Sequence, residues 1–409
     1  MREFMDYVHS AFYEATGWNR DNSYAALNST PNALLEFPTP RGLRLTLSSL
    51  SSPNFATSYE LGSVGVVDGS ISYLYSSVPL RVAIESRSDR ISLPSLLRAY
   101  RPLAPLTELK SKTSGLTGGQ DVAKSSLLYG RLYLPQSLLE ALVVKRISPA
   151  LQVQFSAVSG AHLRNGGTTV GLAQYDVGRY ALEGLASSDG GLLGFRGVYN
   201  FGGDAEPPKV AAPSENGNHS ERERIYGRFS TGGEIYYGTL NKSGGISLGA
   251  RFATLPSHNG TPLAATLTVN PLMGTISANY AVVAGKHCSL ATRMEFNVFS
   301  YESSWAVGTE LWRKPLPRLV DDNYGLPKRS FASKLKWKLD DPEPIKTPKD
   351  GDPEEYAGVL KARMDQNLQI GVLWEGRIKS LLFSLGSGID LRKTDKPFRT
   401  LGLEIQFSS

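Results

Sequence analysis

The sequence predicts an all-β protein in which one large antiparallel sheet closes on itself, as in a transmembrane β-barrel. About twenty segments of roughly 8–12 residues alternate apolar and polar side chains, as tilted membrane strands do. Only 20% of the 409 residues are charged, while glycine and tyrosine are abundant at 41 and 19, which favours β structure. Polar stretches interrupt one continuous series of strands, so a single closed sheet explains the pattern better than several soluble sandwiches.

Residues 1–18 are predicted to form an N-terminal amphipathic helix. One face carries apolar side chains at helical spacing, namely Phe4, Met5, Val8, Phe12 and Ala15. Gly17 follows these positions and is expected to end the helix. Such a helix could lie on the periphery of any domain, but the sharper interpretation places it in or against the lumen of a barrel.

From Arg41 onward the apolar period changes from 3.6 to 2, and residues 41–409 are predicted to form a single β-barrel domain. In "RGLRLTLSSL" three leucines alternate with Arg44, Thr46 and Ser48. The same alternation recurs in "GSISYLYSSV", "ALQVQFSAV" and "SKLKWKLD", the last at residues 333–340. We expect Leu, Val, Tyr, Phe and Trp on the lipid side, and Arg, Lys, Gln, Ser and Glu on the lumen side.

Long polar connections are expected near residues 86–124, 202–224 and 314–356. The first contains "LPSLLRAYRPL", which could be helical, and the second has the composition of a disordered loop. The third carries six prolines around one predicted strand. A soluble protein made of several sandwiches would place linkers between repeated domains, and no such linkers are visible, so this alternative is the weaker one.

The sequence shows no pattern of catalytic, cofactor-binding or metal-ligating residues. The five histidines are far apart and lack metal-ligand spacing. His287 and Cys288 are neighbours, but adjacent strand residues point to opposite faces and cannot form a nucleophile–base pair. We therefore expect no enzyme, no cofactor and no metal. The net charge of +6 comes from scattered basic residues, so we expect no nucleic-acid partner either.

Targeting features agree with a membrane barrel. The N-terminus lacks the basic and apolar regions of a secretory signal peptide, and no window holds about 18 uninterrupted apolar residues. The C-terminal "TLGLEIQFSS" fits the sorting signal of eukaryotic outer-membrane barrels, which needs a polar residue, a glycine and two hydrophobic residues. The matching positions are Thr400, Gly402, Ile405 and Phe407.

Four motifs resemble the fungal mitochondrial distribution and morphology family of outer-membrane barrels, the tenth of its series. They are "MREFMDYVHSAFYEATGWNRDNSY", "FPTPRGLRLTLSSL", "SYELGSVGVVDGSISYLYSSVPL" and "LLYGRLYLP". The resemblance implies a mitochondrial porin-type barrel of about 19 strands, with first and last parallel and an N-terminal helix in the lumen. Our count of about twenty strands therefore contains one segment too many, and we place it near residues 357–375, where helix and strand are both open.

The resemblance also implies a role as an adaptor in the mitochondrial outer membrane. Such an adaptor anchors the ER–mitochondria encounter structure (ERMES) beside its SMP-domain subunits, and supports phospholipid exchange, mitochondrial morphology and inheritance. It also joins the core barrel and peripheral subunits of the sorting and assembly machinery (SAM), and assists assembly of the outer-membrane translocase. The alternative is a transport channel of the voltage-dependent anion channel or protein-import type. Partners would contact the lipid-embedded wall or the loops, and the aromatic and apolar candidates are Tyr73, Tyr75, Ile235, Tyr237 and Phe296.

Overall fold

A computed structural model describes the chain apart from a number of short and long segments. Those outside the description are residue 65 and residues 81–86, 107–123, 162, 164–165, 203–226, 257, 259, 286, 315–355 and 393–397. Within the described part of the chain, no helix has the length and apolar character needed to cross a membrane.

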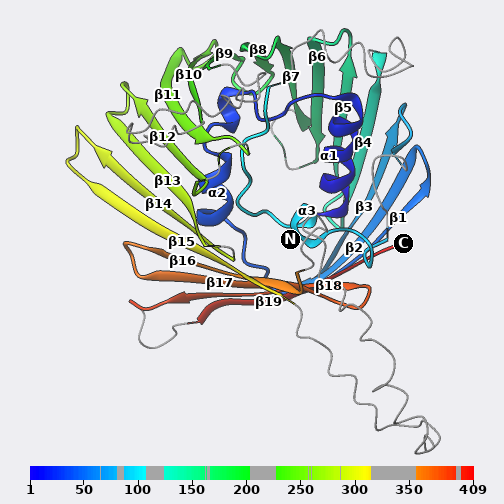
Figure 1. Cartoon of the computed structure of the whole chain (residues 1–409). Helices are drawn as coiled ribbons and strands as arrows, with labels where there is room; N and C mark the ends of the chain where they lie inside the picture. Colours follow the sequence, from blue (N-terminus) through cyan, green and yellow to red (C-terminus); the bar gives the residue numbers. More distant parts are fainter. Residues whose placement is uncertain are drawn as a thin grey trace, which may run out of the picture.

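Nineteen strands of the described chain form one closed sheet around a central lumen (Figure 1). Each strand pairs antiparallel with its neighbours in sequence, and a parallel pairing of the first strand with the last closes the ring. The strands are β1 Gly42–Ser52, β2 Phe55–Val64, β3 Val66–Ser76, β4 Ser126–Leu134, β5 Leu138–Arg146, β6 Leu151–Ser159, β7 Gly167–Asp176, β8 Tyr180–Ser187, β9 Leu192–Phe201, β10 Gly227–Gly238, β11 Ser243–Thr254, β12 Leu263–Asn270, β13 Thr275–Gly285, β14 Cys288–Asn297, β15 Ser303–Arg313, β16 Gly358–Asp365, β17 Gln369–Ile378, β18 Leu381–Asp390 and β19 Phe398–Ser408. The predicted barrel with its parallel closure is therefore confirmed.

The count of about twenty strands from the sequence exceeds the nineteen of this sheet. The stretch 357–375, where helix and strand were both open, belongs to the two strands β16 and β17, so the surplus does not lie there. The strand predicted at 333–340 lies outside the described residues.

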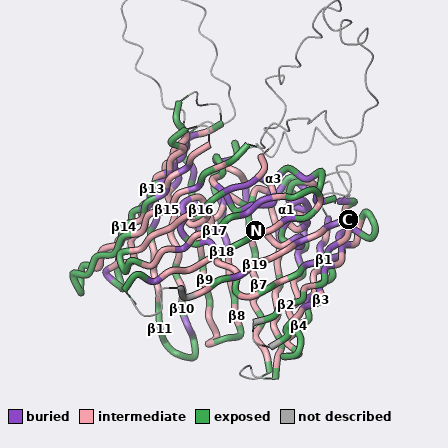
Figure 2. Tube along the Cα trace, turned by 90° about the horizontal axis from the view of Figure 1, so that it is seen from below, coloured by how far each residue is buried: buried purple, intermediate pink, exposed green. Residues whose placement is uncertain are grey.

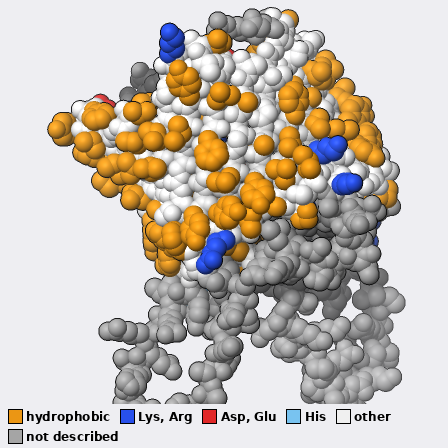
Figure 3. Space-filling view, turned by 90° about the horizontal axis from the view of Figure 1, so that it is seen from above, with side chains coloured by type: hydrophobic (Ala, Val, Ile, Leu, Met, Phe, Trp, Pro, Cys, Tyr) orange, Lys and Arg blue, Asp and Glu red, His pale blue; other side chains and the backbone are white. Residues whose placement is uncertain are grey.

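Alternation along each strand separates an outer wall from an inner wall. In β1, Leu43 and Leu47 are 53% and 48% exposed, whereas Thr46 and Ser48 are buried. The outer wall seen in Figure 3 is dominated by hydrophobic side chains, with few charged groups. Buried polar residues on the inner wall include Arg131, Gln152, Glu183, Asn200, Arg251, Asn279, Glu310, Lys361, Glu375 and Gln406.

The N-terminal helix α1 (Phe4–Thr16) lies inside the barrel against β2 and β3 (Figure 1). Gly17 ends it in the left-handed conformation, with φ of 67°, which glycine adopts without steric penalty. Val8 and Phe12 are fully buried and pack in one cluster with Leu74 and Leu127 of the barrel wall. The inner wall is therefore apolar beneath α1, and the expectation of a uniformly polar lumen side is wrong there. The apolar face of the helix needs an apolar partner surface.

The chain then crosses the lumen to its opposite side. The short helix η1 (Tyr24–Ala26) contacts β9 and β10, and α2 (Ser29–Leu35) contacts β13 to β16. Leu34 and Leu35 are buried with Ala281 and Ala291 of the wall. Figure 1 shows α1 and α2 on opposite sides of the lumen. Residues 36–41 lead from α2 back to the start of β1.

Part of the connection between β3 and β4 also enters the lumen. Its helix α3 (Leu93–Leu96) contacts α1, and the potential helix in "LPSLLRAYRPL" is limited to these four residues. Farther along, Leu103 is buried with Ala253 and Ala264 of β11 and β12. We call residues 1–41 and 87–106 together the luminal plug. Many of its residues are buried, as Figure 2 shows around α1 and α3.

The two rims of the barrel differ in their connections. At one rim the strands are joined by residues 65, 135–137, 160–166, 188–191, 239–242, 271–274, 298–302, 366–368 and 391–397. The polar connections expected near 86–124, 202–224 and 314–356 join β3 to β4, β9 to β10 and β15 to β16 in chain order. Residues 107–123, 203–226 and 315–355 lie outside the described part of the chain.

Candidate functional site: the closing strand, the outer wall and the luminal plug

The strand β19, where the sequence predicts a sorting signal, is the strand that closes the barrel. It pairs parallel with β1 and antiparallel with β18. Thr400 and Gly402 belong to the inward-facing set, like the buried Gln406. Ile405 and Phe407 belong to the outward-facing set, which presents two hydrophobic side chains to the outside. The signalling role of these four residues stays a prediction.

Gly402 has a structural role that the signal pattern does not reveal. A β-carbon at this position would overlap the backbone of Pro40 and Arg41 in the luminal plug. Its partner on β18, Gly386, lies against the ring of the same Pro40. Pro40 and Arg41, which connect the plug to β1, therefore pack directly on two paired glycines. A side chain at either glycine would displace this connection from the wall.

Tyr73 and Tyr75 point outward from β3 and are 45% and 46% exposed. Tyr73 stacks on Phe55 with a centroid distance of 5.9 Å and meets the edge of Tyr59 at 6.5 Å. Leu74, between the two tyrosines, is buried against the plug. On β3, Leu74 therefore packs against α1, while the adjacent Tyr73 and Tyr75 form part of an aromatic cluster on the outer wall.

The remaining surface candidates also face outward, at other places around the ring. Ile235 and Tyr237 on β10 are 57% and 50% exposed. Phe296 on β14 is half-buried, beside Met294, which is 59% exposed. Because β3, β10 and β14 are well separated in the strand order, the candidates form three separate surfaces rather than one.

Buried charges tie the plug to the wall near β16 and β17. Glu375 pairs with the amino group of Met1 and with Lys361, whose Nζ lies 2.8 Å from the carboxylate. Lys361 also donates to the backbone oxygen of Arg98 at 2.6 Å. All three charged groups are withdrawn from solvent, and buried charges are tolerated only with such partners. The pairing holds two parts of the plug against one patch of the wall.

A second network holds the start of α1. Arg131 of β4 pairs with Glu60 of β2 and, at 2.7 Å, with Glu3 ahead of the helix. It also donates to Ser70 of β3 at 3.1 Å, and Arg44 pairs with Glu60 at 2.9 Å. Burial raises the pKa of the Glu3 carboxyl, and Arg131 opposes that shift. The network therefore connects β1, β2, β3 and β4 on the inner wall, beside the pairing of β1 with β19.

Two further arginines hold α2 and the chain that follows it. Arg293 donates to Glu36 and to Asn32, both at 2.6 Å. Arg363 donates to the backbone oxygen of Leu35 at 3.2 Å. Fixed guanidinium forks therefore satisfy polar groups at the end of α2.

The sequence predicted none of these luminal charges individually. Their signal is a charged residue at an inward position of an alternating strand, as with Lys361 in "GVLKARMD" and Glu375 in "QIGVLWEGRI". The alternation predicts which side chains point into the lumen. It cannot predict an ion pair or hydrogen bond with a residue several hundred positions away in the sequence.

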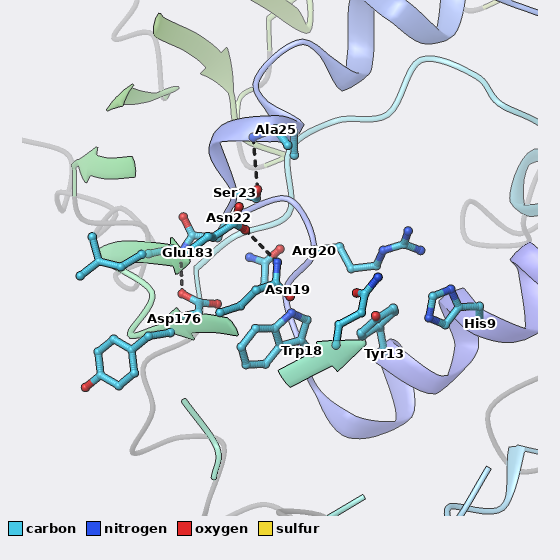
Figure 4. A pocket seen from close by; sticks show the side chains of 16 residues that line it. His9, Tyr13, Trp18, Asn19, Arg20, Asn22, Ser23, Ala25, Asp176 and Glu183 are labelled. Carbon is cyan, nitrogen blue, oxygen red and sulfur yellow. Dashed lines mark hydrogen bonds between the residues drawn. The ribbon is translucent and has the colours of Figure 1, made fainter. Parts of the chain in front are cut away.

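Two cavities of the described residues lie at the plug, the smaller one against the wall and the larger one within the plug. The smaller, of about 290 Å³, lies among Trp18, Asn22 and Asp176 (Figure 4). The larger, of about 900 Å³, shares His9 and Tyr13 with it and extends toward the segment after α3. Burial and the nearby Arg20 lower the pKa of His9 to about 4, so the imidazole is neutral at cellular pH.

Metal-binding groups do not gather within the described residues, where no three His, Cys, Asp or Glu side chains come together. Cys288, at the start of β14, is a free, half-buried thiol. The described lumen therefore offers polar and basic groups rather than a ligand set for a metal.

Comparison with known proteins gives a consistent result. The family model described as "Mitochondrial distribution and morphology protein 10" matches residues 1–324 and 326–409. The protein of that name from Chaetomium globosum is 61% identical, over 95% of this chain and 99% of the relative. Those from Podospora anserina and Neurospora crassa are each 56% identical, over the full length of both chains.

Proposed function

The chain belongs to the family of mitochondrial distribution and morphology protein 10, and on this premise we propose that it is an adaptor anchored in the mitochondrial outer membrane. Family membership supports the coarser statement that it acts in mitochondrial distribution and morphology. The finer proposal is a protein that organises others around its outer wall and rims, without catalysis and without a cofactor.

The observation that carries the proposal is a contrast between the two sides of the sheet. The plug occupies the lumen, whereas the apolar side chains of the outer wall are exposed. Helices α1 and α2 and the segment 87–106 occupy the lumen. Ion pairs of Met1 with Glu375 and of Glu3 with Arg131, and a hydrogen bond from Lys361 to Arg98, hold parts of them to the wall. Transport of large solutes needs a clear lumen, which this plug obstructs. The outer wall, by contrast, offers separate apolar and aromatic surfaces on β3, β10 and β14.

A lipid bilayer suits this outer wall. The strands range from 8 to 12 residues, and a tilted strand of about 9–11 residues crosses a membrane. Outward positions are apolar, and a closed ring leaves no unpaired edge in contact with lipid. Together with the mitochondrial family, these features support the outer membrane as the location.

The proposed partners fall into two groups. One is the ER–mitochondria encounter structure, whose SMP-domain subunits would dock on this anchor and support phospholipid exchange, morphology and inheritance. The other is the sorting and assembly machinery, with its core barrel and peripheral subunits and the translocase intermediates. We assign the outward candidates Tyr73, Tyr75, Ile235, Tyr237 and Phe296 to these contacts, because three separate surfaces allow more than one partner at a time.

A paired experiment tests the adaptor against the channel alternative. The purified full-length protein is recorded in a planar bilayer, and the tagged protein is isolated from mitochondria in mild detergent. An adaptor predicts no sustained ion-selective current and co-isolation of both assemblies. A variant lacking residues 1–18 serves as a control, because removal of α1 opens part of the lumen and should raise the conductance. A large, selective current from the intact chain, with neither assembly co-isolated, would refute the proposal.

A further inference from the structure

The larger cavity lies within the luminal plug, and its charged lining residues are four arginines and four carboxylates. It encloses about 900 Å³ and is lined by residues of α1, of the chain between α1 and α2, and of the segment after α3. Four arginines line it: Arg2, Arg20, Arg98 and Arg101. They come from three separate stretches of the plug, so folding of the plug inside the barrel is what brings them together.

The arginines are only partly compensated by the acids around them. Arg98 lies 3.6 Å from Asp6, and both side chains are about half exposed. Arg20 donates to the hydroxyl of Ser10 at 3.1 Å and lies over the ring of Tyr13. Weak pairs of this kind leave most of the positive charge available.

Arg2 and Arg101 carry the excess charge. Among the described residues, neither guanidinium has an ion-pair partner. Burial and repulsion by Arg101, Arg20 and Arg98 lower the pKa of Arg2 to about 10. Asp6 opposes that shift, so Arg2 is subject to both burial and the repulsion of its neighbours.

The acids of the lining do not remove this excess. Glu36 is engaged by Arg293 of the wall at 2.6 Å. The charge of Asp21 also acts on a further guanidinium, that of Arg251 of the wall. Asp6 and Glu14 are the remaining carboxylates of the lining, against the four arginines. This chamber is therefore positive overall when the wall arginines Arg251 and Arg293 are counted together with its lining.

We propose that this chamber is a binding site for a phosphate-bearing anion. Guanidinium forks match the oxygens of a phosphate and bind them through charge-assisted, paired hydrogen bonds. The volume lies within the range of small-molecule pockets, and is sufficient for pyrophosphate or for the phosphomonoester headgroup of a lipid. This inference goes beyond the adaptor role and does not depend on it.

Calorimetry on the full-length protein in a non-ionic detergent tests the site. One arm titrates inorganic pyrophosphate and the other titrates short-chain phosphatidic acid, with short-chain phosphatidylcholine as the lipid lacking a phosphomonoester. Binding should weaken as salt rises, because salt screens the arginines. Heat from pyrophosphate identifies a free anion as the ligand, and heat from phosphatidic acid alone identifies a headgroup.

The variant that removes the excess charge is Arg2→Gln with Arg101→Gln. Loss of two charge-assisted contacts should weaken binding by about tenfold or more. The matched control is Arg90→Gln with Arg392→Gln, which removes two exposed arginines outside the cavity and should bind like the wild type. If the double variant does not fold, Arg101→Gln alone replaces it, because Arg101 is exposed and lies on a loop.

Two results would overturn the proposal. The first is the absence of binding to the wild type in both arms at low salt. The second is equal loss in the control pair and the cavity pair, which would indicate general attraction to a basic protein. Failure of either kind leaves the adaptor role standing, because that role rests on the outer wall.

Discussion

Neighbouring residues of one strand meet opposite surroundings in this barrel, and β17 illustrates the contrast. Trp374 points outward and is 44% exposed, while Glu375 points inward and is fully buried with Lys361 and the amino group of Met1. The outer residue has no partner across the lumen, and the inner one holds a distant part of the chain. The inner wall therefore maintains the structure, and the outer wall is free to meet lipid or other proteins.

The same division holds on β3, with a different chemistry inside. Leu74 packs against α1 in an apolar cluster, while Tyr73 and Tyr75 form an outward aromatic surface. The polarity of the inner wall thus matches the plug residues that it contacts, which are charged at Glu375 and apolar at Leu74. Substitutions on the two walls should differ accordingly, in stability for the inner wall and in partner binding for the outer.

The largest effect is expected when the buried charge cluster is broken. Glu375→Leu leaves Lys361 and the amino group without their partner, and should lower the free energy of unfolding by about 3–5 kcal/mol. Trp374→Leu, one position away on the outer wall, should change it by less than about 1 kcal/mol. Thermal unfolding in detergent measures both, and equal losses would contradict the division between the walls.

Acid should weaken the plug through His9. Its pKa is about 4 in the folded protein against an ordinary value of 6.5, so the unfolded chain takes up a proton first as the pH falls. The contribution to stability is present above pH 6.5 and is lost toward pH 4, by up to about 3 kcal/mol. His9→Gln should remove this part of the pH dependence. Parallel pH profiles of variant and wild type would refute it.

The closing strand should be sensitive to substitution at the inward Gly402 and tolerant of it at the outward Leu401. Gly402→Val would overlap the backbone at Pro40 and Arg41, a misfit of about 1–3 kcal/mol, and should reduce assembly into a compact barrel. Leu401→Val, on a residue that is 67% exposed, should assemble normally. Import into isolated mitochondria followed by native gels compares the two. Normal assembly of the glycine variant would show that the close approach at Pro40 is dispensable.

The smallest effect on stability is expected on the outer wall. Replacing Tyr73 and Tyr75 with Ala removes aromatic contacts worth about 0.5–1.5 kcal/mol, while the barrel should remain intact. Co-isolation of at least one of the two proposed assemblies should fall. Leu128→Ala, an exposed residue on the adjacent β4, is the control for lost apolar area. Unchanged co-isolation of both assemblies would exclude this pair as a docking surface.

The wall of the barrel was largely predictable from the sequence, because side-chain alternation depends only on neighbouring residues. It placed Leu43, Leu47, Tyr73 and Tyr75 on the outside and Thr46 on the inside, as the structure shows. Helix and strand remained open near residues 357–375, because "AGVLKARMDQN" fits both periods until its partner strands are known.

The plug was predictable only as an amphipathic helix with a stop at Gly17. Its contacts join residues far apart in sequence, such as Glu3 with Arg131 and Met1 with Glu375. No local pattern encodes such pairs. The apolar inner patch at Leu74 was missed for the same reason, since a polar lumen is the average expectation and the helix that reverses it lies elsewhere in the chain.

The most direct test of the division between the walls is site-specific photo-crosslinking in intact mitochondria. A photoreactive residue would replace Tyr75 or Ile235 on the outer wall, and Gln154, which lines the smaller cavity, on the inner wall. The account predicts adducts with other proteins from the outer positions and only intramolecular products from position 154. Adducts between position 154 and a passing polypeptide, with none from the outer wall, would show that the lumen is the working surface and would contradict it.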